Sequence, residues 1–150
     1  AGRDRVFTQF HQTAAGRNYP MRCVQNHRFG YIFNPWSNGE RTFKNESQSG
    51  RTMKGMVSVA ETDKQIADRV HLFLYRVQEE FYNFKDDPDA LNNLISEDDC
   101  MTEIRSLQQK LEEWMDATED PALEAFRNRD SQAALEDFMR TVSDSLGGIC

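Results

Sequence analysis

Tyr-Pro-Met-Arg-Cys-Val-Gln-Asn-His-Arg-Phe-Gly-Tyr-Ile-Phe-Asn, residues 19–34, is the stretch of this chain that decides its fold. Side chains alternate between two sets in both halves: Met21, Cys23 and Gln25 against Arg22 and Val24, then Phe29, Tyr31 and Phe33 against Gly30 and Ile32. Such period-two alternation, rich in aromatic and β-branched residues, is typical of β-strands. Because the polar segment 26–28 separates the two runs, the stretch predicts a β-hairpin.

The segments that flank the hairpin predict one more strand and a long connection. Val6–Phe10 indicates a short strand, and His11–Asn18 is a polar loop that contains a glycine. Residues 34–55 are rich in turn residues and are expected to be irregular. Trp36 and Phe43 are expected to pin this stretch to the body of the protein.

The middle of the chain predicts two helices, a strand and a turn. Residues 52–60 indicate a short helix, and Thr62 with Gln65 has the spacing of a capping box that opens a stronger one. The expected apolar face of that helix consists of Ile66, Val70, Phe73 or Leu74, and Val77. The other expected features are a strand at 80–84, a turn at 86–89, and two apolar anchors, Leu91 and Leu94.

The C-terminal part predicts helices. The clearest runs from Cys100 or Thr102 to about Thr118, with a core-facing stripe of Ile104, Leu107, Leu111, Trp114 and Thr118. Asp120 is expected to cap a second helix with Pro121 at its first position. A last helix is expected to begin near Asp130 or Ser131, with an apolar face of Leu135, Phe138, Met139 and Val142. This order predicts an α+β fold in which a small antiparallel sheet packs one face on the long helix.

Composition limits the classes of function. The 150 residues suffice for one domain with its own core, and the net charge of −7 argues against a nucleic-acid-binding surface. No run is long and apolar enough to span a membrane, and no signal peptide opens the sequence. Residues 1–28 nevertheless carry five arginines against one acid, Asp4. This asymmetry suits an anionic ligand near the N-terminal part, or is a lopsided surface without a ligand.

Motifs for catalysis are missing from the sequence. It contains no His-Glu-x-x-His, no Cys-x-x-Cys, no calcium-loop spacing, no Gly-rich phosphate loop and no Gly-x-Ser-x-Gly. His27 is expected to be solvated and His71 to be structural. His11 differs because it ends a predicted strand and opens a polar loop, which is where scaffolds carry binding groups.

Four segments in order carry a resemblance to a family. They are Arg5-Val6-Phe7 leading to His11, Tyr19-Pro20-Met21-Arg22 with its hairpin, Glu80-Phe81-Tyr82-Asn83-Phe84, and Asp87-Pro88-Asp89-Ala90-Leu91-Asn92-Asn93-Leu94. Together they resemble the C-terminal subdomain of sulfatases, especially the heparan N-sulfatase (sulfamidase)-like branch. Trp114 and Asp120-Pro121 are similar to that branch as well.

The resemblance implies a four-stranded antiparallel sheet against a long helix, beside a larger catalytic domain. In the whole enzyme that domain would supply calcium ligands and a Cys- or Ser-x-Pro-Ser-Arg motif whose nucleophile is formylglycine. Neither Cys23 nor Cys100 begins such a motif, so this chain alone is predicted to be inactive. A periplasmic or secreted parent enzyme would fit the resemblance.

The resemblance also implies substrate contacts and a division of the chain. A sulfated saccharide would meet His11, Gln12, Arg17 and Arg22, although a structural ion pair is an equal alternative for Arg22. Residues 1–18 would belong to the edge of the catalytic domain, 19–144 to the subdomain, and 145–150 to a frayed tail. Self-association through residues 6–10 would then be expected. The rival hypothesis is a free-standing module that binds sulfated carbohydrate or another partner.

Overall fold

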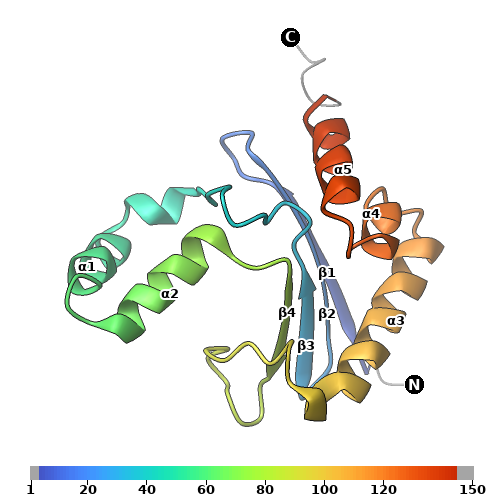
Figure 1. The fold of residues 1–150 in the computed structure, drawn as a ribbon, viewed down its shortest axis with the longest axis horizontal. Helices are drawn as coiled ribbons and strands as arrows, with labels where there is room; N and C mark the ends of the chain where they lie inside the picture. The colour runs from blue at the N-terminus through green and yellow to red at the C-terminus, as the bar shows by residue number, and fades with distance from the viewer. Residues whose placement is uncertain (1–3, 145–150) are drawn as a thin grey trace.

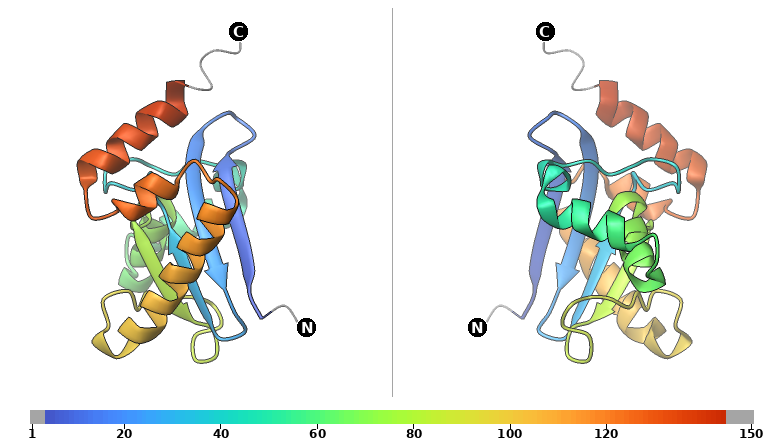
Figure 2. Two further views of the ribbon diagram at one scale, coloured as in Figure 1. Left: turned by 90° about the vertical axis from the view of Figure 1, so that its right-hand side faces the viewer. Right: turned by 90° about the vertical axis from the view of Figure 1, so that its left-hand side faces the viewer.

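The computed structural model describes residues 4–144, so the predicted fraying of 145–150 lies outside the described residues. The elements in chain order are β1 (Val6–Gln12), β2 (Asn18–Gln25), β3 (Phe29–Phe33), η1 (Glu46–Ser49), α1 (Arg51–Val59), α2 (Lys64–Tyr75), β4 (Glu79–Asn83), η2 (Asp98–Cys100), α3 (Met101–Ala117), α4 (Leu123–Arg127) and α5 (Gln132–Asp144). The α+β prediction is confirmed. Figures 1 and 2 show α3, α4 and α5 on one side of the sheet and α1 and α2 on the other.

The sheet is antiparallel throughout and has four strands in the order β1-β2-β3-β4. The predicted hairpin is confirmed, with Arg22 opposite Phe33 and Gln25 opposite Gly30. Its turn is closed by Asn26, whose side-chain oxygen accepts hydrogen bonds from the backbone N–H groups of Arg28 and Phe29 at 2.8 and 2.7 Å. The side chain thereby accepts hydrogen bonds from backbone N–H groups of the turn that would otherwise bond to water.

The main core lies between the sheet and α3. One face of the sheet contributes Val24, Tyr31, Phe33 and Phe81, and the helices contribute Ile104, Leu107, Leu111, Met115, Phe126 and Leu135. Each such side chain stabilises the fold by about 1.5–3 kcal/mol relative to leaving it exposed. The predicted stripe of α3 is wrong at its end. Met115 is buried in the core, whereas Thr118 lies beyond the helix and its hydroxyl donates to the carbonyl of Trp114.

Three other local predictions are wrong. The cap of α2 is Asp63, whose carboxylate accepts from the N–H of Ile66 at 3.1 Å, because a capping carboxylate one residue later competes with Thr62. Val77 follows the end of α2 and is 41% exposed. Leu91 is 51% exposed, since the turn before it directs the backbone to anchor through Leu94 instead.

The connection between β3 and α1 is pinned as predicted, but the prediction that residues 34–55 are irregular is wrong in part, because η1 forms at Glu46–Ser49 and α1 begins at Arg51. Trp36 is fully buried and its ring contacts those of Tyr19 and Phe43, with centroids 5.0 and 5.7 Å apart. The Tyr19 hydroxyl donates to the carbonyl of Thr42 and accepts from the N–H of Lys44. This second, smaller core fixes the connection against β2 and α5.

Strand β1 is an edge strand of the same sheet. It pairs with β2, and the ring of Phe7 stacks on Trp114 of α3 with centroids 5.2 Å apart. Val6 and Phe10 remain 50% and 38% exposed. Within the described residues, no helix is long and apolar enough to cross a membrane.

Two glycines provide a matched test of backbone packing. A Cβ at Gly30 would lie 2.6 Å from the ring of Phe84, whereas one at Gly55 in α1 would meet nothing within 4 Å. We expect Gly30→Ala to lower the free energy of unfolding by about 1–2 kcal/mol because the ring must move. Gly55→Ala should raise it by about 0.5–1 kcal/mol through helix propensity. Urea unfolding measures both, and equal effects would contradict the described packing around Gly30.

Candidate functional site

A cavity of about 740 Å³ is lined by residues at one end of the β1–β2 hairpin and by residues of the helices α4 and α5. Three of the four side chains expected to contact a saccharide, His11, Gln12 and Arg22, line it. We call it the polar cavity; its remaining lining residues are Asn18, Pro20, Pro121, Glu124, Ala125, Asn128, Ala134, Asp137, Phe138, Thr141 and Val142. The cavity forms because α5 packs near the start of β2. Local sequence patterns do not predict this long-range contact.

The guanidinium of Arg22 is held by a buried carboxylate. Its Nε and Nη2 donate to the two carboxylate oxygens of Asp120 at 2.5 and 2.8 Å, and the two side chains are 1% and 3% exposed. Its Nη1 donates to the backbone carbonyl of Met21 at 2.9 Å and to that of Phe10 at 3.4 Å. These contacts agree with the alternative interpretation, in which Arg22 forms a structural ion pair. A direct contact with a saccharide stays a prediction.

The partner carboxylate also organises the connection between α3 and α4. Asp120 Oδ1 accepts the N–H of Ala122 at 2.8 Å, and its carbonyl accepts from the N–H of Leu123. The prediction that Asp120 caps a helix beginning at Pro121 is wrong, because α4 begins at Leu123 after Ala122. The carboxylate bonds both Arg22 and the N–H of Ala122, which ties the connection between α3 and α4 to strand β2.

His11 and Gln12 belong to the end of β1 and not to the loop that was expected to begin at His11. The register with β2 shifts between the pairs of Phe10 and Gln12, next to Pro20. Proline cannot donate a ladder hydrogen bond, so a strand that contains it tends to be irregular at that point. Gln12 Nε2 donates to Gly16 O at 3.1 Å and to Asn18 Oδ1 at 3.3 Å.

Partial burial lowers the pKa of His11 below its ordinary value of 6.5, and the neighbouring charge of Arg22 lowers it further. The carboxylate of Asp120 acts in the opposite direction but more weakly. The lowered pKa favours the neutral imidazole at pH 7. A neutral imidazole can both donate and accept a hydrogen bond, as contact with sugar hydroxyl groups requires.

Arg17 is not part of the polar cavity. It lies in the turn between β1 and β2, where the N–H of Thr13 donates to the carbonyl of Arg17 at 2.9 Å and the N–H of Arg17 donates to Thr13 Oγ1 at 3.3 Å. Its side chain borders a separate depression of about 440 Å³ together with Arg41 and Arg140. The structure thus brings three of the four predicted residues together and leaves the fourth on the neighbouring surface.

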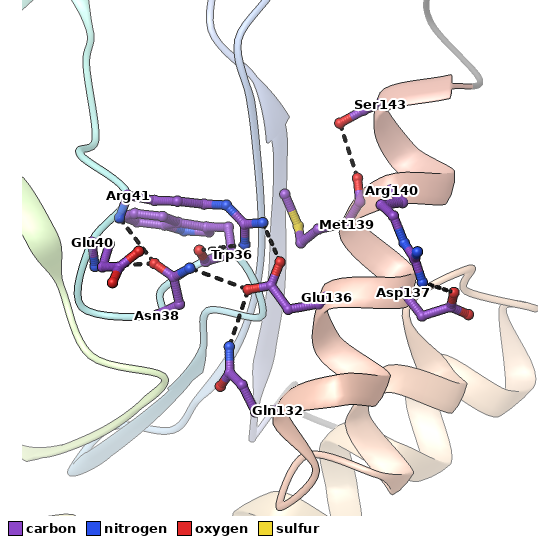
Figure 3. A network of polar contacts seen from close by, with 10 residues as sticks. All are labelled: Trp36, Asn38, Glu40, Arg41, Gln132, Glu136, Asp137, Met139, Arg140 and Ser143. Carbon is purple, nitrogen blue, oxygen red and sulfur yellow. Dashed lines mark hydrogen bonds and ion pairs between the residues drawn. The ribbon is translucent and has the colours of Figure 1, made fainter.

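The wall formed by α5 is fixed by a polar network shown in Figure 3. Glu136 accepts hydrogen bonds from Asn38 and Gln132, both at 3.1 Å, and forms an ion pair with Arg41 at 2.5 Å. Arg140 pairs with Asp137 at 2.6 Å on the same helix. These contacts join α5 to the connection after β3, so the cavity wall does not depend on α4 alone.

The polar cavity combines hydrogen-bonding groups with apolar surface. Gln12, Asn18, Asn128 and Thr141 line it beside Phe138. The amides of Gln12 and Asn128 and the hydroxyl of Thr141 also donate hydrogen bonds within the chain. Its two acidic residues outside the Arg22 pair have basic partners, since Glu124 pairs with Arg127 and Asp137 with Arg140. Residues 4–144 hold no cluster of three or more His, Cys, Asp or Glu side chains that could bind a metal. The arrangement is suited to binding a small polar molecule.

Sequence reasoning missed most of the wall that α4 and α5 contribute. Phe138 was expected on the apolar face of α5, but nothing in its spacing indicated a cavity. Comparison with family models gives no match to this chain, and neither does comparison with curated proteins. The resemblance to sulfatases consequently rests on the residues themselves.

The buried ion pair can be tested against a partly exposed one. Asp120→Asn would leave the Arg22 charge buried without a counter-charge, so we expect it to lower the free energy of unfolding by about 3–5 kcal/mol. Glu136→Gln breaks a pair whose side chains are 34% and 36% exposed, and should cost less than about 1 kcal/mol. Urea unfolding of both variants gives the comparison. Similar small losses would contradict a structural role for the Arg22–Asp120 pair.

The lowered pKa of His11 predicts a direction for pH dependence. The folded chain holds the proton less tightly than the unfolded chain, so the free energy of unfolding should fall as pH drops below about 6.5. His11→Gln should remove this part of the pH dependence. The C2–H resonance of His11, assigned with that variant, should titrate with a midpoint below 6.5. A midpoint above that value would contradict the described surroundings of the ring.

Proposed function

We propose that this chain is the C-terminal, cleft-forming part of a sulfamidase-like sulfatase that acts on sulfated sugars by sulfuric ester or sulfamate hydrolysis. Four ordered sequence segments support the proposal. The four-stranded antiparallel sheet packed on the long helix α3 agrees with the fold that the resemblance implies. The partner would be a catalytic domain that carries the calcium site and the formylglycine.

The observation that supports this function most is the grouping of His11, Gln12 and Arg22 at one cavity. The resemblance to sulfatases predicts, from the sequence, that these three residues face substrate. In the proposed site His11 and Gln12 bond sugar oxygens. Arg22 positions them, because its Nη1 donates to the carbonyl of Phe10 at the end of the same strand.

The edge strand supports a contact outside this chain. Val6 and Phe10 are 50% and 38% exposed, and the ring of Phe10 contacts only the edge of the body through Phe43, with centroids 6.4 Å apart. Strand β1 also has one side that pairs with no strand of the described sheet. A catalytic domain, or a second copy of this chain associating through residues 6–10, would cover both features.

A second candidate function is a free-standing module that binds sulfated carbohydrate. The observation that favours it is the closed core between the sheet and α3, in which Tyr31, Phe33, Phe81 and Phe126 are less than 2% exposed. A chain with such a core can hold a binding site without help from another domain. The two candidates differ in the affinity that they predict for the isolated chain.

Titration of the chain with an N-sulfated glucosamine disaccharide, followed by amide NMR and calorimetry, tests the proposal. The subdomain function predicts shifts at His11 and Gln12 with a dissociation constant weaker than about 1 mM, because part of the site lies on the partner. The N-acetylated disaccharide is the matched control and should shift these residues less. The module function predicts a dissociation constant below about 100 µM.

Sulfate release provides the second measurement. The isolated chain should release no sulfate from the disaccharide, since its sequence lacks the nucleophile motif. Metal-dependent release by the purified chain that stops on adding a chelator would contradict the proposal. Shifts confined to residues far from His11 and Gln12 would contradict the proposed location of the site.

A further inference from the structure

The depression of about 440 Å³ that Arg17 borders concentrates positive charge in a chain whose net charge is −7. We call it the arginine depression. Among the described residues that line it, three are arginines and none is acidic. The lining residues are Arg17, Asn18, Tyr19, Arg41, Thr42, Met139, Arg140 and Ser143. A hollow lined by charges of one sign attracts ligands of the opposite sign.

The three arginines come from segments that are far apart in the sequence. Arg17 lies in the turn between β1 and β2, Arg41 in the connection after β3, and Arg140 on α5. Each backbone is held without help from the guanidinium group. Thr13 bonds the backbone of the turn, and Asn38 Oδ1 accepts the N–H of Arg41 at 2.9 Å. The tertiary fold, and not a local motif, therefore brings these side chains to one place.

The floor of the depression belongs to the second core. Tyr19 and Met139 are 7% and 5% exposed and pack with Trp36. The Tyr19 hydroxyl donates to the carbonyl of Thr42 at 2.9 Å, which fixes another lining residue. Buried apolar groups lower the local dielectric constant and so strengthen electrostatic attraction beside them. An ion in the depression would meet donors arranged around a floor that is already in place.

The guanidinium groups have N–H donors that no group of the chain uses. An arginine carries five such donors. Arg41 uses one for a backbone carbonyl and one for Glu136 at 2.5 Å, and Arg140 uses one for Asp137 at 2.6 Å. Within residues 4–144 the guanidinium of Arg17 has no hydrogen-bond or ion-pair partner. All three arginines can therefore donate to a ligand.

The two carboxylate partners leave the depression open to an anion. Glu136 and Asp137 bond Arg41 and Arg140 but do not line the depression, and Figure 3 shows Arg140 turned toward Asp137. The side chains of this pair are 74% and 73% exposed, and such exposed pairs are weak. Arg140 can thus exchange its partner for a ligand. Within the described residues, the charge of Arg17 is not compensated at all.

We propose that the arginine depression binds a tetrahedral oxyanion, a sulfate or phosphate group that is either a free ion or part of a sugar. Guanidinium groups bind such oxyanions through parallel N–H···O bonds, and four oxygens can serve more than one arginine. Arg17 and Arg41 supply the first contacts, and Arg140 turns from its exposed pair to complete them. The depression is separate from the polar cavity, and the proposal does not rest on the proposed function.

The Nε–H resonances of the arginines report contact with an anion directly. The full chain labelled with ¹⁵N is titrated with sodium sulfate, with sodium chloride at equal ionic strength as the reference. We expect saturable shifts of Arg17, Arg41 and Arg140 with a dissociation constant of about 1–10 mM. Arg105, an exposed arginine of α3, should not shift. The absence of a saturable shift, or equal shifts at Arg105, would overturn the proposal.

A matched pair of variants tests the location. Arg17→Gln removes a guanidinium that has no partner within the described residues, and should weaken sulfate binding by at least about tenfold. Arg105→Gln removes the same charge elsewhere and should bind sulfate like the unaltered chain. Equal affinities of the two variants would overturn the proposal. Circular dichroism establishes that both are folded, and should Arg17→Gln be unfolded, Arg140→Gln takes its place with the same expectation.

The choice of ligand tests the chemistry and identifies the source of the oxyanion. Acetate presents two oxygens in a plane and should bind at least about tenfold more weakly than sulfate, so equal affinities would overturn the proposal. Inorganic phosphate and the N-sulfated glucosamine disaccharide are titrated in the same way. Tighter binding of the disaccharide at Arg17 assigns the site to a sulfated sugar, and tighter binding of sulfate or phosphate assigns it to a free ion. Either result agrees with the proposal, while shifts at His11 and Gln12 report the polar cavity separately.

Discussion

The buried ion pair between Arg22 and Asp120 is the interaction on which the rest of this structure depends. It joins the second strand of the sheet to the connection between α3 and α4, across 98 residues of sequence. Two charges that are almost completely removed from water each require the other, because a single charge left behind would carry the full cost of desolvation. The same guanidinium bonds the backbone of β1, so the edge strand, the sheet and the helical layer meet at one side chain.

The parts of the fold that could be predicted are those with a local period. The hairpin at 19–34 and the stripe Ile104, Leu107 and Leu111 repeat with the spacing of a strand and a helix, and both elements form where the pattern indicates. Their apolar faces also had to meet, since each leaves a stripe that must be buried. The packing of α3 on the sheet could therefore be predicted from the sequence. The end of the buried stripe could not, because Met115 and not Thr118 is its last buried residue.

The candidate site could be predicted only in part, because its walls come from segments that are distant in the sequence. His11, Gln12 and Arg22 lie near the hairpin, and the resemblance to sulfatases implied them, while the polar loop expected after His11 pointed to the same neighbourhood. The helices α4 and α5 that complete the cavity are positioned by Asp120 and by the contacts of Glu136 with Asn38 and Arg41. A local pattern can suggest Asp120 as a helix cap, but it cannot identify a partner in a strand 98 residues away.

The charges that line the polar cavity are compensated within the chain. Arg22 is neutralised by Asp120, and Glu124 and Asp137 are neutralised by arginines of their own helices. Net charge therefore contributes little to recognition there. The expected preference for an N-sulfated over an N-acetylated sugar must come from directed hydrogen bonds between groups such as His11 and Gln12 and the sulfate oxygens, because a sulfate presents more acceptor oxygens than an acetyl group does.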